Sequence, residues 1–216
     1  MLETGSKWIM VGDSISDCDR ARPYGEGLFE GIGRSYVGMV DALLKVHYSE
    51  EKIRVINMGC GGDTSADLLK RWKSDVLDLR PDWVSILIGA NDVWRQFDSP
   101  LLVEQHVTVE EYEHNVKQMI EQTLLMVNGI LLITPYYMEP NRKDKMRARM
   151  DMYGDVIRKL SSEYNLPYVN LQEAFDVALQ EGHANKFSWD RIHPNQAGHM
   201  LIATTILNAI GFEWNK

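Results

Sequence analysis

The sequence predicts an α/β protein in which a parallel β-sheet lies between two layers of helices. Short apolar, β-branched runs recur along the chain, and segments of helical length separate them. This alternation is typical of parallel strands joined by crossover helices. The runs are also almost continuously hydrophobic, as in "WVSILI", which is typical of strands that helices cover on both faces. We therefore expect a three-layer α/β/α sandwich with a flavodoxin-like, five-stranded parallel sheet and right-handed crossovers.

The expected elements follow from these runs. The strands are expected at 7–11, 53–58, 83–88, 130–134 and 168–170. The helices are expected at 33–46, 65–79, 109–126, 144–164, 171–179 and 196–210. Thr108 followed by Glu111 forms a capping-box pattern, which marks the start of one helix. The stretch 90–108 is expected to be a functional loop, because it is long and carries Trp94 and Phe97.

Composition narrows the class of protein. The 216 residues are 44% hydrophobic and show no repeat or composition break, so we expect a single domain over 1–216. A net charge of -8 argues against nucleic acid or an anionic membrane as a partner, and no apolar run approaches the length of a membrane span. Only Cys18 and Cys60 are present, and the first residues lack the apolar stretch of a signal peptide. These features predict a cytoplasmic protein.

Polar residues gather where the predicted strands end. Asp13 and Ser14 follow the first strand, and "WDRIHPN" from 189 to 195 lies near the C-terminus. A serine hydroxyl is a weak nucleophile that needs a base within hydrogen-bond reach and a third group to orient that base. His193 is the candidate base. Asp190, three residues earlier, is the candidate that orients it.

The intermediate of acyl transfer carries an oxyanion, which needs preset hydrogen-bond donors. The candidates are the Ser14 amide, the Gly62 amide and the Asn91 side chain, and the pattern implies neither a metal nor an organic cofactor. Taken alone, Asp13 and Ser14 are more often a helix cap, and glycines or an Asn-Asp pair are more often turn residues. Their joint occurrence at strand ends favours the catalytic interpretation.

These motifs resemble the four blocks of the SGNH/GDSL hydrolase family: Ser14 in "GDSI", Gly62 in "NMGCGGDT", Asn91 in "GAND" and His193 in "DRIHP". The resemblance covers essentially the whole chain. The stretches "GDSISDCDRARP", "RPDWVSILIGANDVWRQFD", "TPYYMEP", "HPNQAGHM" and "IGFEW" are similar to the bacillus-type xylan acetylesterases of this family. This resemblance implies removal of acetyl groups from xylo-oligosaccharides, and a homo-oligomer in which dimers assemble into an octamer.

The expected substrate is therefore a small acetylated sugar. We expect Asp13, Trp94, Trp189 and Tyr136 to contact it, since aromatic faces near the strand ends can stack on sugar rings. Each aromatic taken singly fits a core or interface role nearly as well. The chain has no insertion long enough for a lid or an apolar tunnel, which favours a short acyl group.

Two other functions stay open. One is a lysophospholipase or thioesterase that uses the same triad on longer acyl esters. The other is a non-catalytic, flavodoxin-like module that binds an anion or nucleotide at the same strand ends. The second has little support, because the chain contains neither G-x-G-x-x-G nor a Walker-type lysine.

Overall fold

A computed structural model describes residues 2–214 and contains a five-stranded, wholly parallel sheet. The strands are β1 (Lys7–Gly12), β2 (Arg54–Gly59), β3 (Trp83–Leu87), β4 (Gly129–Ile133) and β5 (Tyr168–Val169). Their order across the sheet is β2-β1-β3-β4-β5. The predicted fold class and the flavodoxin-like strand order are thus confirmed.

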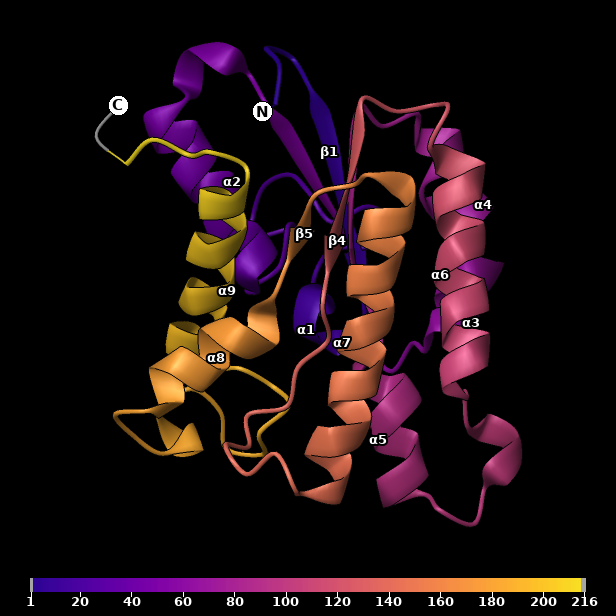
Figure 1. The fold of residues 1–216 in the computed structure, drawn as a ribbon. Coiled ribbons are helices and arrows are strands. Elements are labelled where there is room, and N and C mark those ends of the chain that lie inside the picture. Colours follow the sequence, from indigo (N-terminus) through magenta and orange to yellow (C-terminus); the bar gives the residue numbers. More distant parts are fainter. Residues whose placement is uncertain (1, 215–216) are drawn as a thin grey trace.

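Helices cover both faces of this sheet (Figure 1). On one side α2 (Tyr36–His47) packs against α9 (Gln196–Ala209), which also contacts α8 (Leu171–Leu179). On the other side α6 (Val109–Thr123) lies between α3 (Ser65–Lys70) and α7 (Lys145–Tyr164), and α7 also contacts α5 (Ala90–Asp98). Within residues 2–214, no helix combines the length and the apolar character needed to cross a membrane.

The strands form the core between the two helical layers. Trp8, Ile9, Met10 and Val11 of β1 are at most 1% exposed, although their side chains alternate between the two faces. Val84, Ile86 and the interior of β4 are equally buried. Burial on both faces explains why these strands are almost continuously hydrophobic.

Two of the expected elements differ in the structure. Residues 90–98 of the expected loop form helix α5, followed by the short 3₁₀ helix η3 (Val103–Gln105). The prediction was wrong because the length of the stretch and its aromatic residues were interpreted as a loop, whereas Asn91 and Asp92 are buried in the first turn of a helix. The expected helix 65–79 is divided into α3, α4 (Trp72–Asp75) and the 3₁₀ helix η2 (Leu77–Leu79).

The expected start of α6 is confirmed. The Thr108 side chain accepts a hydrogen bond from the Glu111 amide, and the Glu111 carboxylate accepts one from the Thr108 amide. Two otherwise unsatisfied N–H groups of the first turn are paired in this way. The remaining short elements are α1 (Ser14–Asp17) and the 3₁₀ helices η1 (Ser49–Glu51) and η4 (Ala184–Lys186).

Two glycines allow a matched test of this packing. A Cβ at Gly129 would overlap the Trp83 indole, whereas a Cβ at Gly154 inside α7 would meet nothing closer than Thr134 Cβ at 3.8 Å. We expect Gly129→Ala to lower the free energy of unfolding by about 1 to 3 kcal/mol through overpacking. Gly154→Ala should raise it by about 0.5 to 1 kcal/mol, because alanine loses less entropy in a helix. Urea denaturation measures both, and equal effects of the two variants would contradict this account.

Candidate active site

The register of β1 brings three loops to one edge of the sheet. Gly12 pairs with Gly59 of β2 on one side and with Leu87 of β3 on the other. Parallel strands end at the same edge, so the residues that follow β1, β2 and β3 lie side by side. The sequence predicted the grouping of Ser14, Gly62 and Asn91 for this reason.

The loop after β1 turns at once into the single helical turn α1. Asp13 is its N-cap, and the Asp13 side chain accepts a hydrogen bond of 2.9 Å from the Ile15 amide. Ser14 is the first residue of α1 and is only partly buried. The helix-cap interpretation of Asp13 is therefore correct, and it coexists with a Ser14 hydroxyl placed at the sheet edge.

Ser14, His193 and Asp190 form a chain of hydrogen bonds. Ser14 Oγ lies 2.9 Å from His193 Nε2, and His193 Nδ1 lies 2.6 Å from Asp190 Oδ2. A carboxylate only accepts hydrogen bonds, so it holds the ring proton on Nδ1 and leaves Nε2 to accept the serine proton. This geometry is the one that activation of a serine nucleophile requires.

The turn that carries His193 also fixes its aspartate. Asp190 Oδ1 accepts hydrogen bonds from the amides of His193 (2.7 Å) and Ile192 (2.9 Å), and from Ser188 Oγ (3.0 Å). Burial by itself raises the pKa of Asp190, but the hydrogen bonds from the His193 ring and from these donors outweigh it. The net effect lowers the pKa below its ordinary value. Asp190 therefore stays ionised and cannot rotate away from the ring.

Two backbone N–H groups of the described loops, those of Gly62 and Ser14, have no protein acceptor. In the loop after β2, Cys60 N–H donates to Gly12 O (3.0 Å), Gly61 N–H to Asp17 Oδ2 (2.8 Å) and Asp63 N–H to Cys60 O (3.2 Å). Within residues 2–214, the amides of Gly62 and Ser14 have no such partner. Gly62 has a φ of +86°, which a residue with a side chain rarely adopts.

Asn91 lies at the start of α5, where it can supply a third donor. Its Nδ2 donates to Asp63 O at 2.9 Å, which leaves the second amide hydrogen for another acceptor. The neighbouring Asp92 is fully buried and accepts hydrogen bonds from the Ser65 amide (2.9 and 3.1 Å) and from the Ser65 hydroxyl. Burial raises the pKa of Asp92 to about 6. This contact connects the start of α3 with α5 directly behind the loop that carries Gly62.

The four residues expected to contact the substrate differ in their position and exposure. The Trp94 ring lies edge-on to the His193 ring with 5.5 Å between centroids, and Trp189 is 86% exposed next to Asp190. Tyr136 and Asp13, in contrast, are 0% and 1% exposed, so their side chains lie below the surface. The Tyr136 hydroxyl donates to Ile192 O (3.1 Å) and so supports the turn before His193. Burial raises the pKa of Asp13 to about 7.

Sequence reasoning missed the side chains that support the glycine loop. Arg71 donates to Asp63 Oδ2 (2.6 Å), to Met58 O (2.8 Å) and to Gly12 O (3.1 Å), and thereby connects the ends of β1 and β2. Asp17 was missed as well. No sequence signal identifies either residue, because their distance from the motifs along the chain depends on how the intervening segments fold.

The chain is similar to known proteins over most of its length. Residues 10–201 match the GDSL-like Lipase/Acylhydrolase family, and the chain belongs to that family. It is 47% identical to the acetylxylan esterase of Geobacillus stearothermophilus, over 99% of this chain and 97% of the relative. It is 28% identical to thioesterase 1/protease 1/lysophospholipase L1 of Escherichia coli K12, over 83% of this chain and 77% of that protein.

Solved structures give the same result. A catalytic mutant of Axe2, the acetylxylan esterase from Geobacillus stearothermophilus, superimposes with a TM-score of 0.97 at 46% identity, covering 99% of this chain and 97% of that one. LAE5, described as an alpha/beta hydrolase enzyme from the metagenome of Lake Arreo in Spain, superimposes with a TM-score of 0.96 at 46% identity. The coverage is 98% of this chain and 97% of LAE5.

A second histidine is buried close to the first. His199 on α9 is 4% exposed, and its Nδ1 accepts a hydrogen bond from the Tyr36 amide (3.2 Å). The proton of the neutral ring therefore lies on Nε2, 3.5 Å from Cys18 Sγ. Burial, with a smaller contribution from the charge of His193, lowers the pKa of His199 from 6.5 to about 4.

This shift predicts a loss of stability in acid. Between the unfolded pKa of 6.5 and the folded pKa of about 4, the unfolded chain binds a proton that the folded chain does not. The contribution of His199 to stability therefore falls as the pH falls through this window, by about 2 kcal/mol between about pH 7.5 and about pH 5. The raised pKa values of Asp13 and Asp92 act in the opposite direction over the same window, so the quantity to measure is the stability of the wild type relative to His199→Gln, which should fall by this amount in denaturation curves. His114→Gln, at an exposed position on α6, is the control and should keep the wild-type dependence.

Proposed function

We propose that this protein is a serine esterase that removes O-acetyl groups from carbohydrates, with acetylated xylo-oligosaccharides as the substrate class. The observation that carries the proposal is the 2.9 Å approach of Ser14 Oγ to His193 Nε2, with Asp190 behind the ring and the unpartnered Gly62 and Ser14 amides beside it. The acetylxylan esterase relative at 47% identity supports the choice of substrate.

The proposed reaction uses each group once in acylation and again in deacylation. His193 Nε2 takes the Ser14 proton as Oγ attacks the acetyl carbonyl, and the oxyanion that forms accepts hydrogen bonds from Ser14 N–H, Gly62 N–H and Asn91 Nδ2. His193 then gives its proton to the departing sugar oxygen, which leaves an acetyl-enzyme. Water attacks this ester with His193 again as base, and acetate is released. Asp190 stabilises the charged ring throughout.

The surroundings of Gly62 favour a short acyl group and a polar leaving group. A cavity of about 540 Å³ beside Gly62 is lined largely by polar and charged side chains, among them Lys70, Arg95, Glu104 and Glu111. A long alkyl chain laid there would remove charged groups from water without pairing them, which is costly. Trp94 and the exposed Trp189 are the aromatic faces available to a sugar ring.

The proposal extends to assembly and location. Trp189 is 86% exposed, and Trp214 and the loop residues Leu28 and Phe29 also present apolar surface, so we propose a homo-oligomer, with an octamer assembled from dimers as the expected form. Cys18 and Cys60 are both free thiols, which is compatible with the proposed cytoplasmic location.

Acyl-chain length tests the proposed reaction. We expect kcat/KM for p-nitrophenyl acetate to exceed that for the octanoate ester by at least about tenfold, because the polar cavity penalises added methylenes. Acetate should also be released from acetylated xylo-oligosaccharides. Octanoate hydrolysed as fast as acetate would instead support the thioesterase or lysophospholipase function that the Escherichia coli relative suggests.

The matched control is Ser14→Ala, which should lose on the order of 10⁶ in kcat while the fold is retained. A fluorophosphonate should label the wild type on the peptide that contains Ser14 and should leave Ser14→Ala unlabelled. Labelling on another peptide would show that the nucleophile is misassigned. A folded wild type that is neither labelled nor active would favour the non-catalytic module.

Light scattering coupled to size exclusion tests the oligomer. We expect a particle of about eight times the 24.8 kDa chain mass at micromolar concentration, because exposed aromatic side chains are enriched at interfaces. Trp189→Ser should reduce this mass, whereas Val46→Ser, at another exposed apolar position, is the control. A wild-type particle of 24.8 kDa would refute self-association.

A further inference from the structure

The loop that supplies the Gly62 amide contains two consecutive glycines, and both are exposed. Glycine adopts more backbone conformations than any other residue, so ordering such a pair costs entropy and leaves the peptide plane free to rotate. An oxyanion donor must nevertheless point in one direction before the reaction begins. Some contact therefore has to fix the backbone at Gly61 and Gly62.

Backbone contacts fix both ends of the loop and close a turn around the glycines. The Cys60 amide is held by Gly12 O (3.0 Å) before them, Asp63 O is held by Asn91 Nδ2 (2.9 Å) after them, and the Asp63 N–H donates to Cys60 O (3.2 Å) across them. Between these points, within the described chain, the only side chain that bonds to the backbone of either glycine is that of Asp17. Its Oδ2 accepts the Gly61 N–H at 2.8 Å.

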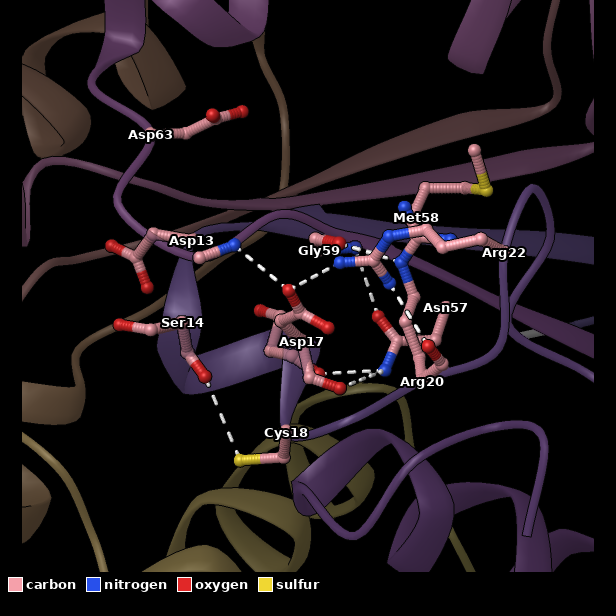
Figure 2. A network of polar contacts seen from close by, with 12 residues as sticks. Asp13, Ser14, Asp17, Cys18, Arg20, Arg22, Asn57, Met58, Gly59 and Asp63 are labelled. Carbon is pink, nitrogen blue, oxygen red and sulfur yellow. Dashed lines mark hydrogen bonds and ion pairs between the residues drawn. The ribbon is translucent and has the colours of Figure 1, made fainter.

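Asp17 is itself held firmly (Figure 2). Arg22 Nη2 donates to the same Oδ2 atom at 2.6 Å, and the Asp17 side chain is only 13% exposed. Burial by itself raises the pKa of Asp17, but the hydrogen bonds from Arg22 and from the Gly61 amide outweigh it and lower the pKa below its ordinary value. The group that holds Gly61 is thus a carboxylate, and a hydrogen bond to a charged acceptor is stronger than one between neutral groups.

The segment that bears Asp17 is fixed to β2 as well. Asn57 of β2 donates from Nδ2 to Ser16 O (2.6 Å), and its Oδ1 accepts the Gly59 amide (2.9 Å). One buried amide side chain therefore joins the end of α1 to the start of the glycine loop. Ser14 and Asp17 are the first and last residues of α1.

We propose that Asp17, held by Arg22, is a positioning residue that orients the oxyanion-hole amide of Gly62 through the Gly61 N–H. Ser14 and Asp17 belong to the same helical turn. The turn that carries the nucleophile therefore also fixes the position of the oxyanion hole. The Gly61 N–H is used by Asp17, and the next N–H along the chain is left to face the substrate oxygen. This proposal rests on the proposed esterase function of the same site.

An ion pair with one half-exposed partner, such as Arg22, often has no function, since pairs near the surface contribute little to stability. The Asp17–Arg22 pair differs from such a pair because Asp17 also accepts the Gly61 N–H. A surface pair would affect stability at most, whereas a positioning contact affects the turnover of folded enzyme. The test therefore compares kcat, KM and the melting temperature in the same variants.

The experiment measures p-nitrophenyl acetate hydrolysis by Asp17→Ala, Asp17→Asn and Asp19→Ala. In Asp17→Ala we expect kcat to fall by about tenfold or more, less than the 10²- to 10³-fold loss of a donor itself, with little change in KM. Asp17→Asn keeps an oxygen that can accept the Gly61 N–H and should recover most of kcat. Asp19→Ala is the matched control, because Asp19 is an exposed residue of the same loop paired with Arg34; it should match the wild type.

Each outcome decides the proposal. Unchanged kcat in folded Asp17→Ala, or equal loss in Asp17→Ala and Asp17→Asn with a lowered melting temperature, overturns it. If Asp17→Ala does not fold, Arg22→Ala, at a half-exposed side chain, replaces it and should lower kcat several-fold without raising KM; wild-type kcat there overturns the proposal. Wild-type protein that hydrolyses no ester refutes the proposed function and the positioning role with it, whereas an active wild type with an inert Asp17 refutes the positioning role alone.

Discussion

The parallel pairing of β1 with both β2 and β3 is the constraint on which the rest of the site depends. Gly12 lies level with Gly59 and Leu87, so three loops start at the same edge. The strand order β2-β1-β3 makes this a switch point, because α2 packs on one face of the sheet while α3 and α6 pack on the other (Figure 1). A Cβ at Gly12 would overlap Ser16 Oγ and Leu87 O, so only glycine allows this close approach.

Local environment shifts the pKa values of the aspartates of this region in opposite directions. Asp190 and Asp17 accept several N–H donors or an arginine, and their pKa values are lowered. Asp13 and Asp92 lie fully buried, and desolvation raises their pKa values to about 7 and about 6. Asp190 and Asp17 hold His193 and the Gly61 amide in place, whereas Asp13 and Asp92 support α1, α3 and α5.

The relatives of this chain show that one catalytic site can serve substrates with different acyl groups. An acetylxylan esterase and a thioesterase/lysophospholipase both align with it across most of its length. Triad geometry is independent of acyl length, so the walls beyond Gly62 must determine the substrate. In this chain those walls carry Lys70, Arg95, Glu104 and Glu111, and we propose that their charges favour acetyl over a fatty chain.

The sequence by itself determined the sheet and its strand order, because hydrophobic runs locate strands, and it predicted that Ser14, Gly62 and Asn91 meet, because residues at parallel strand ends share one edge. The three-residue spacing predicted the pairing of Asp190 with His193. It could not determine that Tyr136 and Asp13 are buried, since an aromatic or a carboxylate near a strand end has the same local pattern whether it faces solvent or core. Nor could it assign Asp17, Arg71 or Asn57, whose partners are backbone atoms of other segments. Backbone groups carry no sequence signature, so only the tertiary structure decided which side chains hold the glycine loop.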